Sequence, residues 1–306
     1  YIVIESWLNE QSTNENRGIV FSVYVMITLT VLAAGQMMTL LYDPAGLELF
    51  LIASVLVSLG AIPVALSLSP SPQQPAGVEL DMRRLYRISP SGSVGCLAVG
   101  LANGAFWSLA PVFTAGISSD TSLAAWFMTS AVLGGALAQW PLGSVSDKIG
   151  RRKVILGASL FGAVIAIAAV LSGIELGFWF INLLGAGWGA VAFPLYALSV
   201  AHANDYAEPE DYVMVSSGLL LMYGVGAIIG PFIASIFMSS VGAVGLFAFA
   251  AIIHVLLAIF VTHRMLRRSS TPDEQHMSFS DALATAHTAS QVYEEEIQHI
   301  AEEEAA

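Results

Sequence analysis

Charged side chains are scarce in this sequence, and that scarcity sets its class. Of the 306 residues only 11% are Asp, Glu, Lys or Arg, whereas 56% are hydrophobic. A typical soluble domain carries about 25% charged residues, so a water-soluble fold could not cover this much apolar surface. The composition predicts an all-α membrane protein, because helices satisfy their own backbone hydrogen bonds in lipid.

The few charges are also unevenly placed. The formal net charge is -12, but nine of the 23 acidic residues and none of the 11 basic residues follow Arg268. We expect residues 269–306 to form an acidic and largely disordered cytoplasmic tail, and no nucleic-acid partner is expected. The one cysteine, Cys96, cannot form a disulfide within the chain.

The sequence also lacks an initial methionine and a basic leader. It opens at Tyr1 inside an apolar phrase. We therefore expect it to begin part-way through a longer chain, with residues 1–8 ending an earlier helix.

A bilayer core of about 30 Å requires about 20 apolar residues in a helix, and we expect eight complete spans of that kind. The apolar runs are 18–42, 46–66, 93–113, 123–142, 153–171, 175–198, 212–238 and 241–261. All the basic residues flank these runs at alternate ends, whereas the turns at 43–45, 116–122, 172–173 and 239–240 contain none. By the positive-inside rule, both ends of the chain are predicted to be cytoplasmic in a multi-pass inner (plasma) membrane protein.

The longest internal connector, residues 67–92, contains four prolines and a basic cluster. This composition is typical of an extended linker, so we predict a boundary between two helical bundles. Residues 1–66 would end the first bundle with a helix remnant and two complete helices. Residues 93–268 would form the second bundle, with six helices.

One motif stands between the fourth and fifth runs, and it reads Gly143-Ser-Val-Ser-Asp147-Lys148-Ile-Gly150-Arg151-Arg152. It resembles the loop signature of the major facilitator superfamily. The opening Glu5-Ser-Trp-Leu-Asn9-Glu10 and the segment His202-Ala-Asn204-Asp205 resemble the YcaD-like branch of that family. The resemblance implies a major facilitator fold of two pseudo-symmetric six-helix bundles, the first incomplete here, and secondary active transport by alternating access.

The motif has a physical interpretation of its own. Gly143 and Gly150 suit a tight turn, and Asp147 could face the positive end of the helix that starts near Arg17. Arg151 could pair with Asp147 or with Asp205, which would make a cytoplasmic gate. The alternative is that Lys148, Arg151, Arg152 and their neighbours only fix the topology.

The resemblance also implies a central cavity lined by the third and sixth runs, the family's helices seven and ten. The polar and aromatic candidates there are Asn103, Phe106, Trp107, Asn182, Trp188 and Tyr196. The alternative for each aromatic residue is packing against lipid or another helix. The pairs Gly185/Gly189 and Gly226/Gly230 have the small-xxx-small spacing of close helix contacts rather than of binding.

No run carries a carboxylate or guanidinium near its centre, so we expect any acid that couples transport to a proton or sodium ion to lie in preceding helices. His254 is mid-span, but a lone histidine there is expected to be a hydrogen-bonded packing residue. A membrane-embedded lipid-modifying enzyme would need a cluster of acids or histidines that the sequence lacks, and a transporter-like receptor would signal through the tail. We predict a monomeric transporter of a small molecule in the lipid bilayer, not an enzyme, with neither cofactor nor metal.

Overall fold

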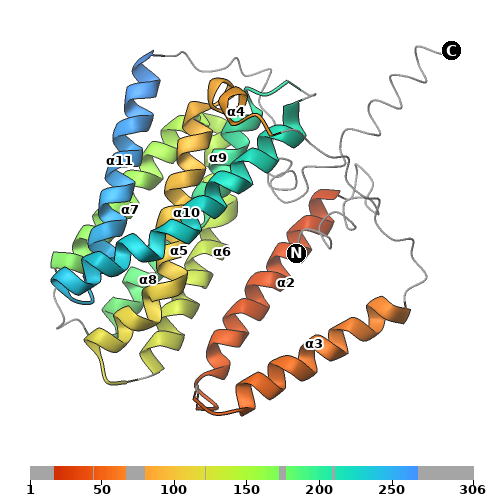
Figure 1. Ribbon diagram of the computed structural model, residues 1–306, viewed down its shortest axis with the longest axis vertical. Helices are drawn as coiled ribbons and strands as arrows, with labels where there is room; N and C mark the ends of the chain where they lie inside the picture. Colours follow the sequence, from red (N-terminus) through yellow and green to blue (C-terminus); the bar gives the residue numbers. More distant parts are fainter. Residues whose placement is uncertain are drawn as a thin grey trace.

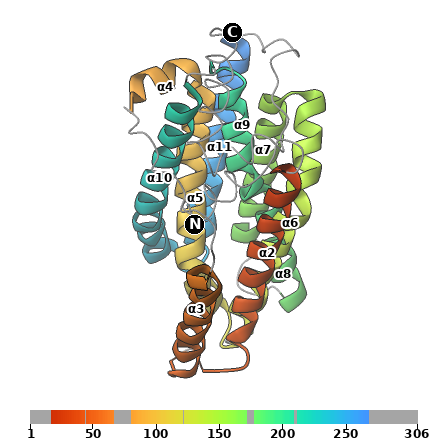
Figure 2. The ribbon, with the colours of Figure 1, turned by 90° about the vertical axis from the view of Figure 1, so that its right-hand side faces the viewer.

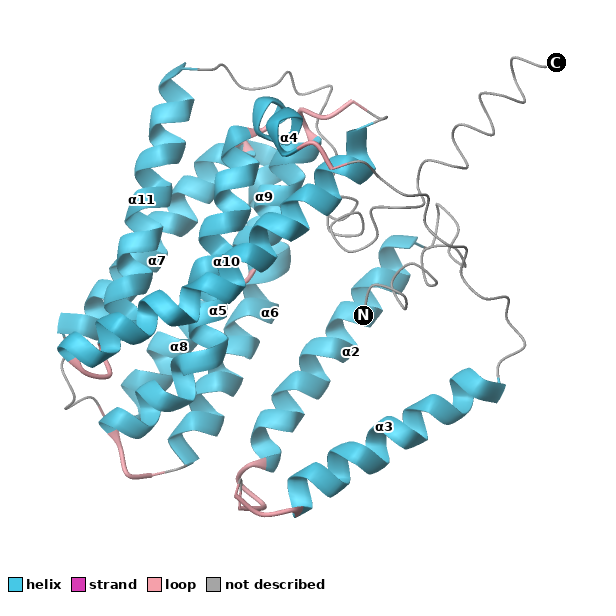
Figure 3. Cartoon of the chain, in the orientation of Figure 1, coloured by secondary structure: helices cyan, strands magenta, loops and turns pink. Residues whose placement is uncertain are grey.

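The computed structural model describes residues 17–43, 45–66, 80–120, 122–171, 177–208 and 211–267. Within them the secondary structure is helical, and short loops join the helices (Figure 3). The helices are α2 (Arg17–Met38), α3 (Glu48–Leu66), α4 (Met82–Ile88), α5 (Pro90–Ile117), α6 (Ser122–Ile149), α7 (Arg151–Leu171), α8 (Phe178–Ala192), α9 (Pro194–Asn204), α10 (Tyr212–Val241) and α11 (Gly245–Arg267). Seven of the eight predicted runs each correspond to one helix, and the described part of the run 175–198 forms two, α8 and α9.

Six membrane-spanning units pack together from α5 to α11 (Figure 1). Helices α8 and α9 form one of these units, because the chain stays helical through Phe193 and Pro194 starts α9. With α3, seven helical segments are long and apolar enough to cross a membrane, and the described side chains of α2 form a shorter apolar segment. The predicted all-α membrane fold is confirmed.

Glycines set the two closest helix contacts of this bundle. A Cβ atom at Gly189 of α8 would collide with the carbonyl oxygen of Ala131 in α6, and one at Gly230 of α10 would collide with that of Leu101 in α5. In lipid no hydrophobic effect drives helices together, so their association depends on van der Waals contact. The close approach of two backbones provides that contact. The predicted packing role of these glycines is confirmed.

Helices α2 and α3 lie to one side of the bundle in Figure 1 and in front of it in Figure 2. Helix α2 packs along α6. Helix α3 has no buried residue, although its hydropathy is among the highest of the candidate spans. The described part of the chain therefore does not cover the apolar side chains of α3.

The predicted linker is partly helical. Asp81 caps α4 by accepting hydrogen bonds from the backbone N–H groups of Arg83 and Arg84, each at 2.9 Å. The Arg84 and Arg83 amides hold the pKa of this carboxyl below its usual range. Ser89 then ends α4 and caps α5 through Gly92, with Pro90 in the first turn. Residues 67–79 lie outside the described part of the chain.

Candidate functional site

The family-like motif lies mostly inside a helix rather than in a loop. Helix α6 continues to Ile149, so Gly143 is a helical residue whose carbonyl accepts a hydrogen bond from Ser146 Oγ at 2.7 Å. Only Gly150 separates α6 from α7, and its φ of 95° lies in the left-handed region that a side chain would strain. The expected turn role is thus correct for Gly150 and wrong for Gly143.

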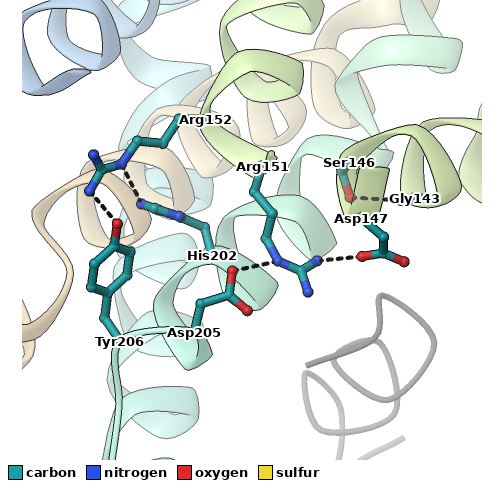
Figure 4. A network of polar contacts seen from close by, with 8 residues as sticks. All are labelled: Gly143, Ser146, Asp147, Arg151, Arg152, His202, Asp205 and Tyr206. Carbon is teal, nitrogen blue, oxygen red and sulfur yellow. Dashed lines mark hydrogen bonds and ion pairs between the residues drawn. The ribbon is translucent and has the colours of Figure 1, made fainter. Parts of the chain in front are cut away.

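Arg151 connects the start of α7 to the ends of α6 and α9 (Figure 4). We call this end of the bundle, where α6 ends and α7 begins, the basic end. Its Nε donates to Asp205 Oδ2 at 2.7 Å, and its Nη1 lies 3.3 Å from Asp147 Oδ1. The sequence offered these acids as alternatives, and Arg151 contacts both. The Arg151 and Asp205 side chains are each 2% exposed, whereas that of Asp147 is 36% exposed. The ion cluster therefore has a buried inner pair and an accessible outer carboxylate.

Arg152 makes a second set of contacts in the same region (Figure 4). It donates to Tyr206 Oη at 2.6 Å and to His202 Nε2 at 3.4 Å, and its guanidinium lies 5.2 Å from the centre of the Tyr206 ring. Arg152 thus holds the start of α7 against the end of α9, while the Lys148 side chain is exposed.

Sequence reasoning missed His202, Tyr206 and one further contact. The sixth predicted run ended at residue 198, but α9 continues to Asn204 and His202 is 3% exposed. Arg84 of α4 donates to Asp211 at 2.8 Å, which ties the linker helix to the start of α10. The sequence did contain a signal, the acidic residues that follow His202, whose charge is opposite to that of the arginines. These acids are far from the arginines in sequence, so the sequence alone could not pair them.

The predicted cavity residues separate into two sets. Phe106 and Trp188 are each 1% exposed, and they stack within the core at a centroid distance of 6.0 Å. Asn182 is also buried, where its Nδ2 donates to Phe178 O at 2.8 Å and its Oδ1 accepts from Ser130 Oγ at 3.3 Å. In this structure these three side chains hold helices together.

The other three candidates lie near the interruption at Pro194. Asn103 donates from α5 to the carbonyl of Ala192 at 3.3 Å. Trp107 is partly buried and stacks on Phe193 at 5.2 Å. Tyr196 is also partly buried, and its ring centre lies 4.9 Å from that of Tyr223 on α10. Polar and aromatic groups from three helices therefore meet beside a helix break.

His254 packs in the core as expected, but within the described part of the chain it lacks the hydrogen bond that was expected with it. It is 2% exposed and its ring lies 5.0 Å from that of Trp188, while a Cβ at Gly162 of α7 would touch it at 3.0 Å. Its ring nitrogens have no hydrogen-bond partner among the described residues. The glycine makes room for this imidazole between α7 and α8.

Comparison with known proteins decides the family. The sequence profile of the Major Facilitator Superfamily matches residues 92–292. The chain belongs to the Major Facilitator Superfamily. The resemblance drawn from the Gly143–Arg152 motif is therefore confirmed, and the chain is a multi-pass membrane protein of that superfamily.

Curated relatives support the same branch of the superfamily. The chain is 25% identical over 242 residues to an uncharacterized MFS-type transporter YcaD of Salmonella paratyphi B, covering 78% of this chain and 62% of that protein. It is 28% identical over 247 residues to the YcaD of Escherichia coli O17:K52:H18, with the same coverage, and 23% identical over 274 residues to that of Escherichia fergusonii. The chain thus spans 62% of the length of the first of these relatives. No solved structure matches it.

Proposed function

We propose that the complete protein is a secondary active transporter of a small molecule, which works by alternating access between two helical bundles. The observation that carries this proposal is the ion cluster at the basic end. Its inner pair, Arg151 and Asp205, is enclosed by the six-span bundle, whereas its outer carboxylate, Asp147, ends the helix on which α2 packs. An accessible charge at the edge of a rigid bundle is suited to make and break a contact with the other bundle.

Asp147 is the proposed gate. Helix α2 begins at Arg17 toward the basic end, and α6 ends there (Figure 1). The start of a helix carries a partial positive charge, which would stabilise a nearby carboxylate by about 0.3 to 1 kcal/mol when exposed. Arg151 keeps this carboxylate oriented. Lys148, Gly150 and Arg152 flank it at the turn between α6 and α7, and Gly143 precedes it within α6.

The proposed substrate cavity is centred on the break between α8 and α9. Asn103, Trp107 and Tyr196 reach it, and Tyr223 lies within side-chain hydrogen-bonding reach of Asn103. Amide and phenol groups beside aromatic rings suit a small molecule with both polar and apolar parts. A proton or sodium ion is the proposed coupling ion, the protein is proposed to act as a monomer, and both ends of this chain are proposed to be cytoplasmic.

Reconstituted vesicles test the proposal. The complete protein is incorporated into liposomes, a proton or sodium gradient is imposed separately, and metabolites accumulated from a cell extract are identified by mass spectrometry. We expect one gradient to drive accumulation of a defined compound. Trp107→Ala should reduce that accumulation severalfold, whereas Trp179→Ala, at an 83% exposed position on α8, should not. Equal contents in protein-containing and empty vesicles under both gradients would contradict transport.

A further inference from the structure

An apolar groove of about 530 Å³ runs along the outside of the bundle between α5 and α11. Its volume is within the range of about 300 to 1,000 Å³ typical of ligand sites. The lining residues are Val94, Leu97, Ala98, Leu101, Ile253, Leu256, Leu257, Ile259, Phe260 and His263. His263 is the one polar side chain among them, so the groove suits an occupant with a long apolar part.

The groove has the depth of one membrane leaflet. On α11 it extends from Ile253 to His263, ten residues that rise about 15 Å. That is half of the hydrocarbon thickness of about 30 Å. On α5 it extends from Leu101 to Val94, toward the same end of the bundle. The groove therefore begins near the membrane centre and ends at the basic end.

Positive charge gathers where the groove meets that surface. His263 is exposed at its mouth, and Arg264 and Arg267 follow in the last turn of α11. The short helix α4, which carries Arg83 and Arg87, lies at the same end of the bundle (Figure 1). Phosphate groups favour such sites, because arginine and imidazole N–H groups donate charge-assisted hydrogen bonds to their oxygens.

We propose that this groove binds an anionic phospholipid of the leaflet at the basic end, with one acyl chain between α5 and α11 and its phosphate at His263 and Arg264. A zwitterionic lipid would fill the apolar part but would offer less charge to the arginines. A second copy of the chain would bring its own Arg264 and Arg267 to the same place, and like charges would oppose that contact. The proposal does not depend on transport activity.

Native mass spectrometry of the complete protein tests the site. Phosphatidylglycerol and phosphatidylcholine of equal chain length are titrated into the detergent-solubilised protein. We expect one phosphatidylglycerol to be retained in preference to phosphatidylcholine. Val94→Trp fills the groove and should abolish this retention. Arg264→Gln should weaken it about fivefold, the effect of one basic residue near an anionic headgroup.

Two matched variants separate the groove from general effects. Val164→Trp places the same side chain on an exposed position of α7, and Lys148→Gln removes an exposed charge from the end of α6, neither of which lines the groove. Both should bind phosphatidylglycerol like the unmodified protein, and thermal unfolding checks that all four variants are folded. Three results would each overturn the proposal. The first is equal retention of the two lipids, and the second is unchanged binding by folded Val94→Trp. The third is a protein dimer that Val94→Trp abolishes, because the groove would then bind a second copy of the chain.

Discussion

The six-span bundle from α5 to α11 and the pair α2 and α3 are both apolar, but they are packed differently. In the bundle, Gly134 and Gly189 bring α6 and α8 to backbone contact, and a Cβ at either would meet a carbonyl group. On the pair, Gly35 and Gly60 have no atom within 4 Å of such a Cβ. Apolar composition places both in the membrane, whereas the placement of small residues determines which helices form a rigid body.

The ion cluster follows the same division. Its inner part ties α7 to α9 within the bundle, and its outer carboxylate stands near the end of α6, the helix on which α2 packs. Removing the inner part should therefore damage the bundle itself. Removing the outer part should change how the bundle and its neighbour are arranged.

The largest expected effect is the loss of the inner pair. Asp205→Ala leaves the Arg151 guanidinium buried without its closest carboxylate, and breaking a buried pair from one side costs about 3 to 5 kcal/mol. We expect a large fall in thermal stability, measured by tryptophan fluorescence in detergent. Asp147→Ala removes the exposed partner and should cost less than about 1 kcal/mol. Equal losses of stability in the two variants would show that the buried and exposed carboxylates do not differ in their contribution.

A smaller effect is expected from the glycine contacts. Gly189→Ala forces a methyl group against Ala131 O, and such overpacking costs about 1 to 3 kcal/mol. Gly60→Ala on α3 meets nothing within 4 Å and gains helix propensity, so it should be neutral or slightly stabilising. The measurement is the melting temperature of each variant relative to the parent chain. If Gly60→Ala were the more damaging change, the contrast between bundle and pair would be lost.

Much of the fold could be predicted from the sequence, because membrane thickness sets the length of an apolar run. The helix ends could not. Hydropathy marks where α6 leaves the hydrocarbon, near Leu142, but it does not mark where the helical hydrogen bonds end. Helix α6 continues to Ile149 although Gly, Ser and Asp have low helix propensity. The same reason explains why α9 includes Ser199 to Asn204.

The site was predicted only where local spacing or a family motif decides it. Arg151 and Asp147 are four residues apart on adjoining helices, so local spacing predicts their contact. Asp205 could be named as an alternative because an arginine pairs with an acidic residue. The contacts Arg152–Tyr206 and Arg84–Asp211 join segments 54 and 127 residues apart. Such pairs depend on how helices are placed in space. For the same reason, sequence could not divide the aromatic candidates into Trp107 beside the helix break and Phe106 in the core.

The most direct test of the account is the distance between the two bundles at the basic end. Spin labels at Val23→Cys on α2 and Leu266→Cys on α11, both exposed positions, report it in the complete protein with Cys96→Ala. We expect Asp147→Asn to shift the population toward the longer distance by roughly two- to fivefold, because it weakens attraction to the start of α2. Asp120→Asn, the same change in the loop before α6, should leave the distribution unchanged. Superimposable distributions for Asp147→Asn and the parent protein would contradict a gate at this position.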